Sequence, residues 1–209
     1  MEHHGISHVI DVGANDGGFA SEIRQLGYDG TIVSFEPLQE PYEKLRRKST
    51  LDGKWQVHRR AIGDFDGEVT INVSGNSGLS SSVLPMLDAH VEVAPNSGYV
   101  AQETVPQARL DTLLPQLGVD TTCRTFLKVD VQGYEAAVLD GAVALFEEGG
   151  ILGLQLELSL TQLYAGGMTY REGLDRAEAL GFSLMGLDPV FSDPRTGRLL
   201  QVDAIFFAA

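Results

Sequence analysis

A chain of 209 residues, 43% of them hydrophobic, is typical of one globular domain over residues 1–209 and excludes wholesale disorder. Its formal net charge of -14 argues against nucleic-acid binding through a basic surface, and its lone cysteine excludes an intramolecular disulfide and a multi-cysteine metal site. Because no apolar run reaches the length of a membrane span and no signal peptide follows Met1, we expect a cytoplasmic protein without membrane insertion.

The first predicted strand, residues 8–12, leads into a turn of small residues and then into a helical pattern. Strand, glycine turn and helix in this order form a nucleotide-type pocket, because glycine lets the backbone approach a ligand and the helix N-terminus offers free N–H groups. The carboxylates of Asp11 and Asp16 would repel a pyrophosphate, but not a cationic or zwitterionic ligand such as S-adenosylmethionine. The small residues of the turn are Gly13, Ala14, Gly17 and Gly18.

The next stretch alternates strand, helix and strand. An apolar run over residues 31–35 predicts a second strand, which ends at Glu36 and Pro37. An acid about twenty residues after the glycine turn typically accepts hydrogen bonds from ribose hydroxyls, so Glu36 is a candidate ligand of a nucleoside. Helical periodicity then covers residues 41–48, and strands are expected at residues 56–61 and 69–73.

Residues 74–104 differ in character from the rest of the chain. They contain clusters of serine, glycine and asparagine, together with a breaker cluster at residues 95–98. Long polar loops in compact domains are commonly functional lids or disordered, so we expect an insertion loop with little regular structure that could close over a ligand. Within it, residues 100–105 could pair as an edge strand.

Regular alternation resumes in the second half. Helices are expected at residues 110–117, 134–146 and 169–180, and strands at residues 126–131, 151–158, 182–187 and 199–207. Strands that alternate with helices predict an α/β fold with a mostly parallel sheet and helices on both faces. The last two strands have no helix between them and should form an antiparallel hairpin at one edge. The predicted strand ends at Asp11, Glu36, Ala61-Ile62, Asp130 and Glu157 should converge on one cleft.

Several short motifs recur together in one protein family. They are Glu36-Pro37, Ala61-Ile62-Gly63-Asp64, Ser80-Ser81-Ser82, Arg109-Leu110-Asp111, the run from Leu127 to Glu135 and Val138-Leu139-Asp140-Gly141-Ala142. With these motifs, the chain resembles the FkbM-type S-adenosylmethionine-dependent O-methyltransferases over about residues 8–160. The resemblance implies a class I, Rossmann-like methyltransferase fold with a seven-stranded sheet. One departure is Gln132, where the family usually has glutamate.

The resemblance also implies a role for each motif. The glycine turn should surround the amino-acid part of S-adenosylmethionine, Glu36 should bind the ribose, and Asp130 should face either the cofactor amino group or the acceptor oxygen. Pro37 and Leu38 should border the adenine. The cofactor-binding residues expected in this way are Asp11, Gly13, Ala14, Asn15, Gly17, Glu36, Pro37, Ala61, Ile62 and Asp130, and Ser80, Ser81 and Ser82 should close over the substrate.

Methyl transfer is an in-line displacement that needs orientation of the acceptor and removal of its proton. Asp130 and Glu157 are the candidate bases, because both are expected at neighbouring strand ends. The same two acids could instead hold a divalent cation such as Mg²⁺, although two carboxylates do not define a metal site. His90 could be a base near neutral pH, but we favour a solvated loop histidine.

The leading hypothesis is transfer of a methyl group to a hydroxyl of a small molecule, such as a sugar or a secondary-metabolite or glycolipid intermediate. Two alternatives remain. A nicotinamide-dependent oxidoreductase should show the GxGxxG order, which the run from Gly13 to Gly18 lacks. A methyltransferase-fold module that binds the cofactor without catalysis is compatible with every motif. The sequence does not define the oligomeric state.

Overall fold

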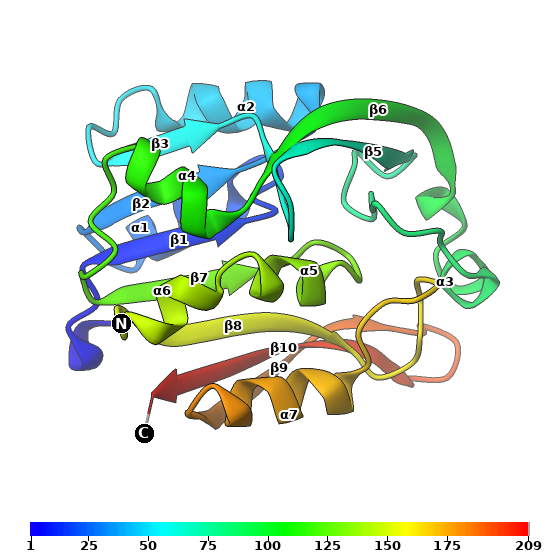
Figure 1. The fold of residues 1–209 in the computed structure, drawn as a ribbon. Coiled ribbons are helices and arrows are strands. Elements are labelled where there is room, and N and C mark those ends of the chain that lie inside the picture. The colour runs from blue at the N-terminus through cyan, green and yellow to red at the C-terminus, as the bar shows by residue number, and fades with distance from the viewer. Residues whose placement is uncertain (209) are drawn as a thin grey trace.

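The computed structural model describes residues 1–208 and is built on a seven-stranded sheet (Figure 1). The strand order is β3-β2-β1-β7-β8-β10-β9, and β10 runs antiparallel to both of its neighbours, whereas the first five strands are parallel. This confirms the expected edge hairpin, with β9 as the outer strand. The strands are β1 (His8–Val12), β2 (Thr31–Phe35), β3 (Trp55–His58), β7 (Thr125–Val129), β8 (Ile151–Ser159), β9 (Phe182–Ser192) and β10 (Leu199–Ala208).

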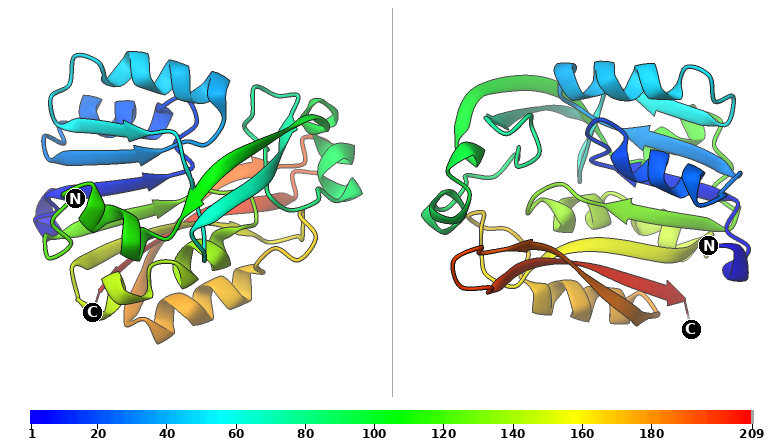
Figure 2. Two further views of the ribbon diagram at one scale, coloured as in Figure 1. Left: turned by 45° about the horizontal axis from the view of Figure 1, so that its top comes forward. Right: turned by 180° about the vertical axis from the view of Figure 1, so that it is seen from behind.

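Helices cover both faces of this sheet (Figures 1 and 2). One face carries α1 (Gly18–Gln25) and α2 (Gln39–Ser49), and the other carries α4 (Leu110–Gln116), α5 (Glu135–Asp140), α6 (Val143–Glu147) and α7 (Tyr170–Ala179). The central strand β7 is buried at every position, which explains why it appears in the sequence as a nearly continuous apolar run. Thr169 and Glu172 form a capping box that starts α7. A short 3₁₀ helix, η1 (Glu2–His4), precedes β1.

A second, three-stranded sheet stands at the carboxyl ends of the parallel strands. It has the order β4-β6-β5, with β4 (Ala61–Ile62), β5 (Gly67–Ser74) and β6 (Tyr99–Ala108). The expected strand over residues 56–61 is therefore divided between the two sheets. Val69 pairs with Val105 and Thr70 with Thr104, so β-branched residues face one another across the strands.

The expectation of an insertion with little regular structure over residues 74–104 holds for residues 75–87, which contain no helix or strand, and is wrong for the residues after them. The strand expected over residues 100–105 lies within β6, but as the middle strand of the second sheet and not at its edge. Residues 75–98, called here the cap segment, contain α3 (Asp88–Val93) and the 3₁₀ helix η2 (Pro95–Ser97), and β6 begins directly afterwards. Leu84, Met86, Ala89 and Val93 of the cap segment pack around the buried side chains of Leu163, Tyr164 and Leu200. The physical reason for the difference is this cluster, because its partners come from a distant part of the chain.

Backbone contacts fasten the cap segment to the loop that follows β8. Leu87 N–H donates to Leu163 O at 2.8 Å, and Ala165 N–H donates to Pro85 O at 2.8 Å. The cap segment therefore lies over the carboxyl ends of the strands as a packed unit (Figure 2). None of the helices within residues 1–208 has the length and apolar character needed to cross a membrane.

Candidate active site

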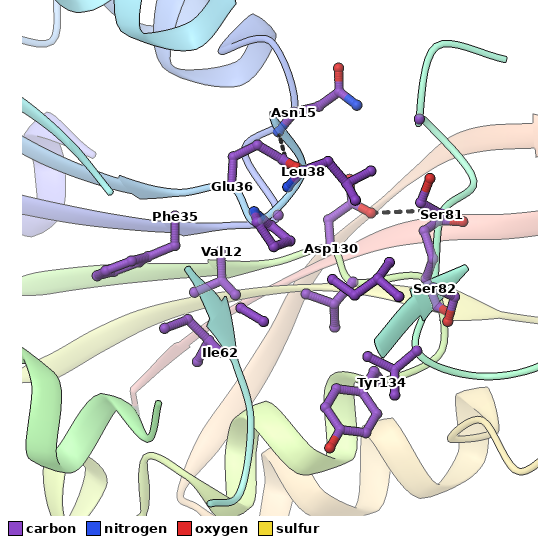
Figure 3. Close-up of a pocket in the computed structure, with 18 of the residues that line it drawn as sticks. Val12, Asn15, Phe35, Glu36, Leu38, Ile62, Ser81, Ser82, Asp130 and Tyr134 are labelled. Atoms are coloured by element: carbon purple, nitrogen blue, oxygen red, sulfur yellow. Dashed lines mark hydrogen bonds between the residues drawn. The ribbon is translucent and has the colours of Figure 1, made fainter. Parts of the chain in front are cut away.

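A cleft lies between the carboxyl ends of β1, β2 and β7 and the cap segment (Figure 3). The space inside it, its open mouth included, is about 680 Å³. Its walls include Val12, Gly13, Asn15, Phe35, Glu36, Pro37, Leu38, Arg60, Ala61, Ile62, Leu79, Ser81, Ser82, Val83, Asp130, Gln132 and Tyr134. The site is therefore at the edge of the sheet where the sequence placed it.

The glycine turn after β1 brings two backbone segments into close contact. Gly13 has a φ of 78°, and a Cβ atom there would lie 1.8 Å from the carbonyl oxygen of Asp130. Any side chain at this position would push the turn after β1 away from the turn after β7. At the start of α1, Gly17 has a φ of 84° and lies against Leu45 and Trp55. Both glycines are required by the local geometry.

Glu36 is held at the cleft wall by backbone donors on both sides. Its Oε2 atom accepts from Asn15 N–H and its Oε1 atom accepts from Leu38 N–H, both at 2.8 Å (Figure 3). Burial raises the pKa of Glu36 to about 7, although the two backbone hydrogen bonds oppose the shift. Each oxygen keeps a lone pair, so the carboxylate can accept two neighbouring hydroxyl groups.

Lys128 pairs with two carboxylates beneath the cleft. Its ammonium nitrogen lies 3.5 Å from Asp11 Oδ1 and 3.4 Å from Asp130 Oδ2. Although burial favours the neutral amine, Asp130 and Asp11 together raise the pKa of Lys128. Asp11 is fully buried and accepts from Ser34 Oγ at 3.1 Å, whereas the Asp130 side chain is 32% exposed and lines the cleft. Asp11 therefore supports the site from below.

Gln132 links Asp130 to Glu157. Its Nε2 atom donates to Asp130 Oδ1 at 2.9 Å and to Glu157 Oε2 at 2.6 Å, and Gln201 Nε2 also donates to Glu157 Oε2 at 2.7 Å. Desolvation, reinforced by the charge of Asp130, raises the pKa of Glu157 well above its usual range. Since an amide nitrogen lies between the two carboxylates, they do not fit a magnesium ion. Among residues 1–208, no group of three or more His, Cys, Asp or Glu side chains is arranged to hold a metal.

The structure brings together most of the residues that the sequence singled out. Those that line the cleft are Gly13, Asn15, Glu36, Pro37, Ala61, Ile62, Ser81, Ser82 and Asp130. Those that do not are Asp11, Ala14, Gly17, Ser80, His90 and Glu157. Ala14 packs in the core against α1, and Glu157 lies behind Gln132, which donates to its Oε2 atom.

His90 is buried, so the interpretation as a solvated loop histidine is wrong. It is 2% exposed, and its ring meets the Tyr164 ring edge-on with centroids 5.4 Å apart. Its Nε2 atom is hydrogen bonded to Ser80 Oγ at 3.3 Å, and burial lowers its pKa. The ring belongs to the packing beneath the cap segment and does not reach the cleft.

Several residues of the site carried no signal in the sequence. Arg60, Leu79 and Val83 line the cleft, but no motif marks them. Tyr164 lies between β8 and α7, and its hydroxyl donates to Gln132 Oε1 at 2.7 Å. Gln132 did carry a signal, since it departs from the family pattern, but that departure alone indicated no role in the site.

A parallel core with its cleft at the carboxyl ends of β1, β2 and β7, and an antiparallel edge, defines the class of Rossmann-like methyltransferases. Residues 11–184 match the model of the methyltransferase FkbM domain, and the chain belongs to this family. It is therefore an S-adenosylmethionine-dependent methyltransferase, as the sequence motifs predicted. None of the curated proteins compared with it matches.

Solved structures support the fold at low sequence identity. Precorrin-6y C5,15-methyltransferase from Geobacter metallireducens has a TM-score of 0.52 and 10% identity, covering 98% of this chain and 81% of its own. Magnesium protoporphyrin IX methyltransferase from Synechocystis, with bound S-adenosylmethionine, has a TM-score of 0.50 and 10% identity. The match covers 100% of this chain and 73% of that protein. An uncharacterized protein from Listeria monocytogenes has a TM-score of 0.52 and 9% identity. The match covers 97% of this chain, which spans only 62% of the length of that protein.

Proposed function

We propose that the protein transfers the methyl group of S-adenosylmethionine to a hydroxyl of a small molecule, such as a sugar or a secondary-metabolite or glycolipid intermediate. The observation that supports binding of this cofactor is the position of the Glu36 carboxylate. The N–H groups of Asn15 and Leu38 hold it in place, and both of its oxygens remain available to a ribose diol. The adenine would then lie against Leu38, Ala61 and Ile62, which form an apolar wall of the same cleft.

A hydroxyl acceptor is supported by the turn after β7. This turn reads Asp130-Val131-Gln132-Gly133 and lacks the Asn/Asp-Pro-Pro-aromatic segment that grips a planar nitrogen. Asp130 is the carboxylate that lines the cleft next to the cap segment, whereas Glu157 lies behind Gln132. Asp130 is therefore the better candidate for the group that takes the hydroxyl proton.

The chemistry asks little of the protein beyond orientation. The cofactor supplies a methyl group that its sulfonium already activates. The walls of the cleft would hold the acceptor oxygen in line with the methyl carbon and the sulfur. Orientation of this kind can lower the activation barrier by roughly several kcal/mol. Lys128 and Gln132 fix the Asp130 carboxylate in the cleft, so it can accept a proton without first having to reorient.

The side chains of Ser80, Ser81 and Ser82 form hydrogen bonds within the protein that stabilise the cap segment. Ser82 Oγ donates to Gln132 O at 2.7 Å, Ser81 Oγ accepts from Ser74 N–H at 3.0 Å, and Ser80 Oγ contacts His90. Contact with the substrate through Ser81 and Ser82, which line the cleft, remains a prediction. The cytoplasmic location, the single domain over residues 1–209 and the roles of Asp11, Ala14 and Gly17 near the cofactor also remain predictions.

Calorimetric titration with S-adenosylhomocysteine and, separately, with NADH tests the cofactor. We expect binding of the former only; binding of NADH alone would contradict the proposal and favour an oxidoreductase. Methyl transfer is then measured from radiolabelled S-adenosylmethionine to a panel of sugars, glycolipid precursors and hydroxylated metabolites, with amines as the comparison. Labelling of amines alone would contradict O-methylation, and cofactor binding without any labelling would favour a non-catalytic module.

A further inference from the structure

Gln132 occupies an unusual backbone and side-chain position for a polar residue. Its φ of 56° lies in the left-handed region that non-glycine residues rarely adopt, and its side chain is buried. Strained positions of this kind persist where the surroundings over-determine them, often at functional sites. Here the carbonyl of Gln132 accepts from Ser82 Oγ at 2.7 Å, so the cap segment holds its main chain as well.

The orientation of the Gln132 amide follows from its partners. Its nitrogen faces the carboxylate oxygens of Asp130 and Glu157, and its oxygen faces the hydroxyl of Tyr164. Rotation of the amide by half a turn would place oxygen against oxygen at two contacts. Burial raises the pKa of Tyr164 above its ordinary value, so the hydroxyl is protonated at neutral pH. Of its two acceptors, Gln132 Oε1 at 2.7 Å is nearer than Ser80 O at 3.2 Å.

Asp130 is consequently fixed from two directions. Lys128, which also pairs with Asp11 beneath the glycine turn, holds one oxygen from the cofactor side. Gln132, which Tyr164 and Ser82 tie to the cap segment, holds the other. Figure 3 shows Asp130 between Glu36 and the pair of Ser81 and Ser82. The carboxylate therefore lies where the cofactor part of the cleft meets the part under the cap segment.

As an extension of the proposed function, on which it rests, we propose that Gln132 is a positioning residue. Its amide, oriented by Tyr164, holds the Asp130 carboxylate toward the point where the transferred methyl group meets the acceptor hydroxyl. A neutral amide suits this position because it donates to two acids at once. Glutamate at the same place would remove that donor and put a third carboxylate beside Asp130 and Glu157. The glutamine that replaces the usual glutamate of the family motif is thus complementary to its neighbours Asp130, Glu157 and Tyr164.

The test compares two ligands that differ only at the reacting centre. Sinefungin carries a CH(NH₂) unit, an ammonium at neutral pH, in place of the S–CH₃ sulfonium, and S-adenosylhomocysteine carries a neutral sulfur there. If Asp130 faces the transferred methyl group, the wild type prefers sinefungin by about tenfold or more, as a charge-assisted hydrogen bond supplies. If Asp130 instead faces the amino-acid end, both ligands bind alike and the inference fails.

Three variants locate the effect. Gln132→Met, which keeps the length and removes the donor, and Asp130→Asn should each bring the preference close to onefold, while Tyr164→Phe should lower it about threefold. Tyr28→Phe is the control, because the Tyr28 hydroxyl donates to Thr31 O at the start of β2 and does not touch Gln132 or its partners. Affinity for S-adenosylhomocysteine should stay within about threefold in the control and in Tyr164→Phe, since neither of these side chains lines the cleft.

The outcomes separate the inference from the function on which it rests. An unchanged preference in Gln132→Met, with a lost preference in Asp130→Asn, would overturn the role of Gln132. Equal weakening of both ligands in Gln132→Met would overturn it too, because that result describes a general loosening of the cleft. A wild type that binds neither ligand would overturn the proposed function itself.

Discussion

The two sides of the cleft are built in different ways. On the cofactor side, glycines and backbone N–H groups within about 25 residues of one another shape the turn after β1 and fix Glu36. On the cap side, residues from the cap segment, from the turn after β7 and from the loop after β8 meet through side chains. The comparison teaches that the cofactor side is specified mainly by residues close in the chain, with the contact of Gly13 with Asp130 O as its long-range part. The cap side depends on side-chain contacts between distant parts of the chain.

The largest effect is expected for Gly13→Ala. The added Cβ would lie 1.8 Å from Asp130 O, so the turns after β1 and β7 must separate. Affinity for S-adenosylhomocysteine should fall by about 100-fold or more, equivalent to roughly 2.8 kcal/mol. Gly118→Ala is the matched control, since Gly118 has a φ of 71° but no atom within 4 Å of the added Cβ. Equal losses in both variants would mean that a general destabilisation of the fold, and not the clash with Asp130 O, is responsible.

Removal of the ribose acceptor should come next. Glu36→Gln replaces a carboxylate that accepts from two backbone N–H groups and should weaken S-adenosylhomocysteine binding by about 10- to 100-fold, as expected for hydrogen bonds to a charged group. Glu22→Gln makes the same change on the exposed face of α1 and should leave the affinity unchanged. Calorimetry measures both, and an unaltered affinity in Glu36→Gln would remove this residue from the site.

A substitution on the cap side should lower the stability of the protein and have little effect on cofactor affinity. Leu163 is fully buried in the cluster beneath the cap segment, so Leu163→Ala should lower the free energy of unfolding by about 2–5 kcal/mol. Affinity for S-adenosylhomocysteine should change by less than about threefold, because distant sites act independently. Denaturant unfolding and calorimetry check the two parts, with the exposed Leu51→Ala as control. A large loss of affinity would show that the two sides are not separable.

What could be predicted from the sequence follows the same division. The strand at His8–Val12, the glycine turn and Glu36 are close in the chain, and their spacing alone indicated a nucleoside site. The burial of His90 could not be predicted, because its ring packs against Tyr164 and Phe191, which lie more than 70 residues away in the chain. The burial of Asp11 was missed for a related reason, since its partner Lys128 comes from the neighbouring strand.

The smallest expected effect concerns pH and again belongs to the cofactor side. Burial raises the pKa of Glu36 from 4.5 to about 7 in the free protein, so the folded chain retains a proton that the unfolded chain loses. The contribution of Glu36 to stability therefore falls as the pH rises from 4.5 to about 7. Ribose hydroxyls donate to the carboxylate form, so binding of the nucleoside lowers this pKa and releases a proton.

The most direct test of the account is the affinity for S-adenosylhomocysteine measured by calorimetry at pH 6 and pH 8, in the wild type and in Glu36→Gln. In the wild type, the affinity should be weaker at pH 6 by up to about tenfold, because the carboxylate must first lose its proton. In Glu36→Gln the affinity should be lower and nearly the same at the two pH values. A wild-type affinity that does not change with pH, or a variant that keeps the wild-type dependence, would contradict the central role of Glu36.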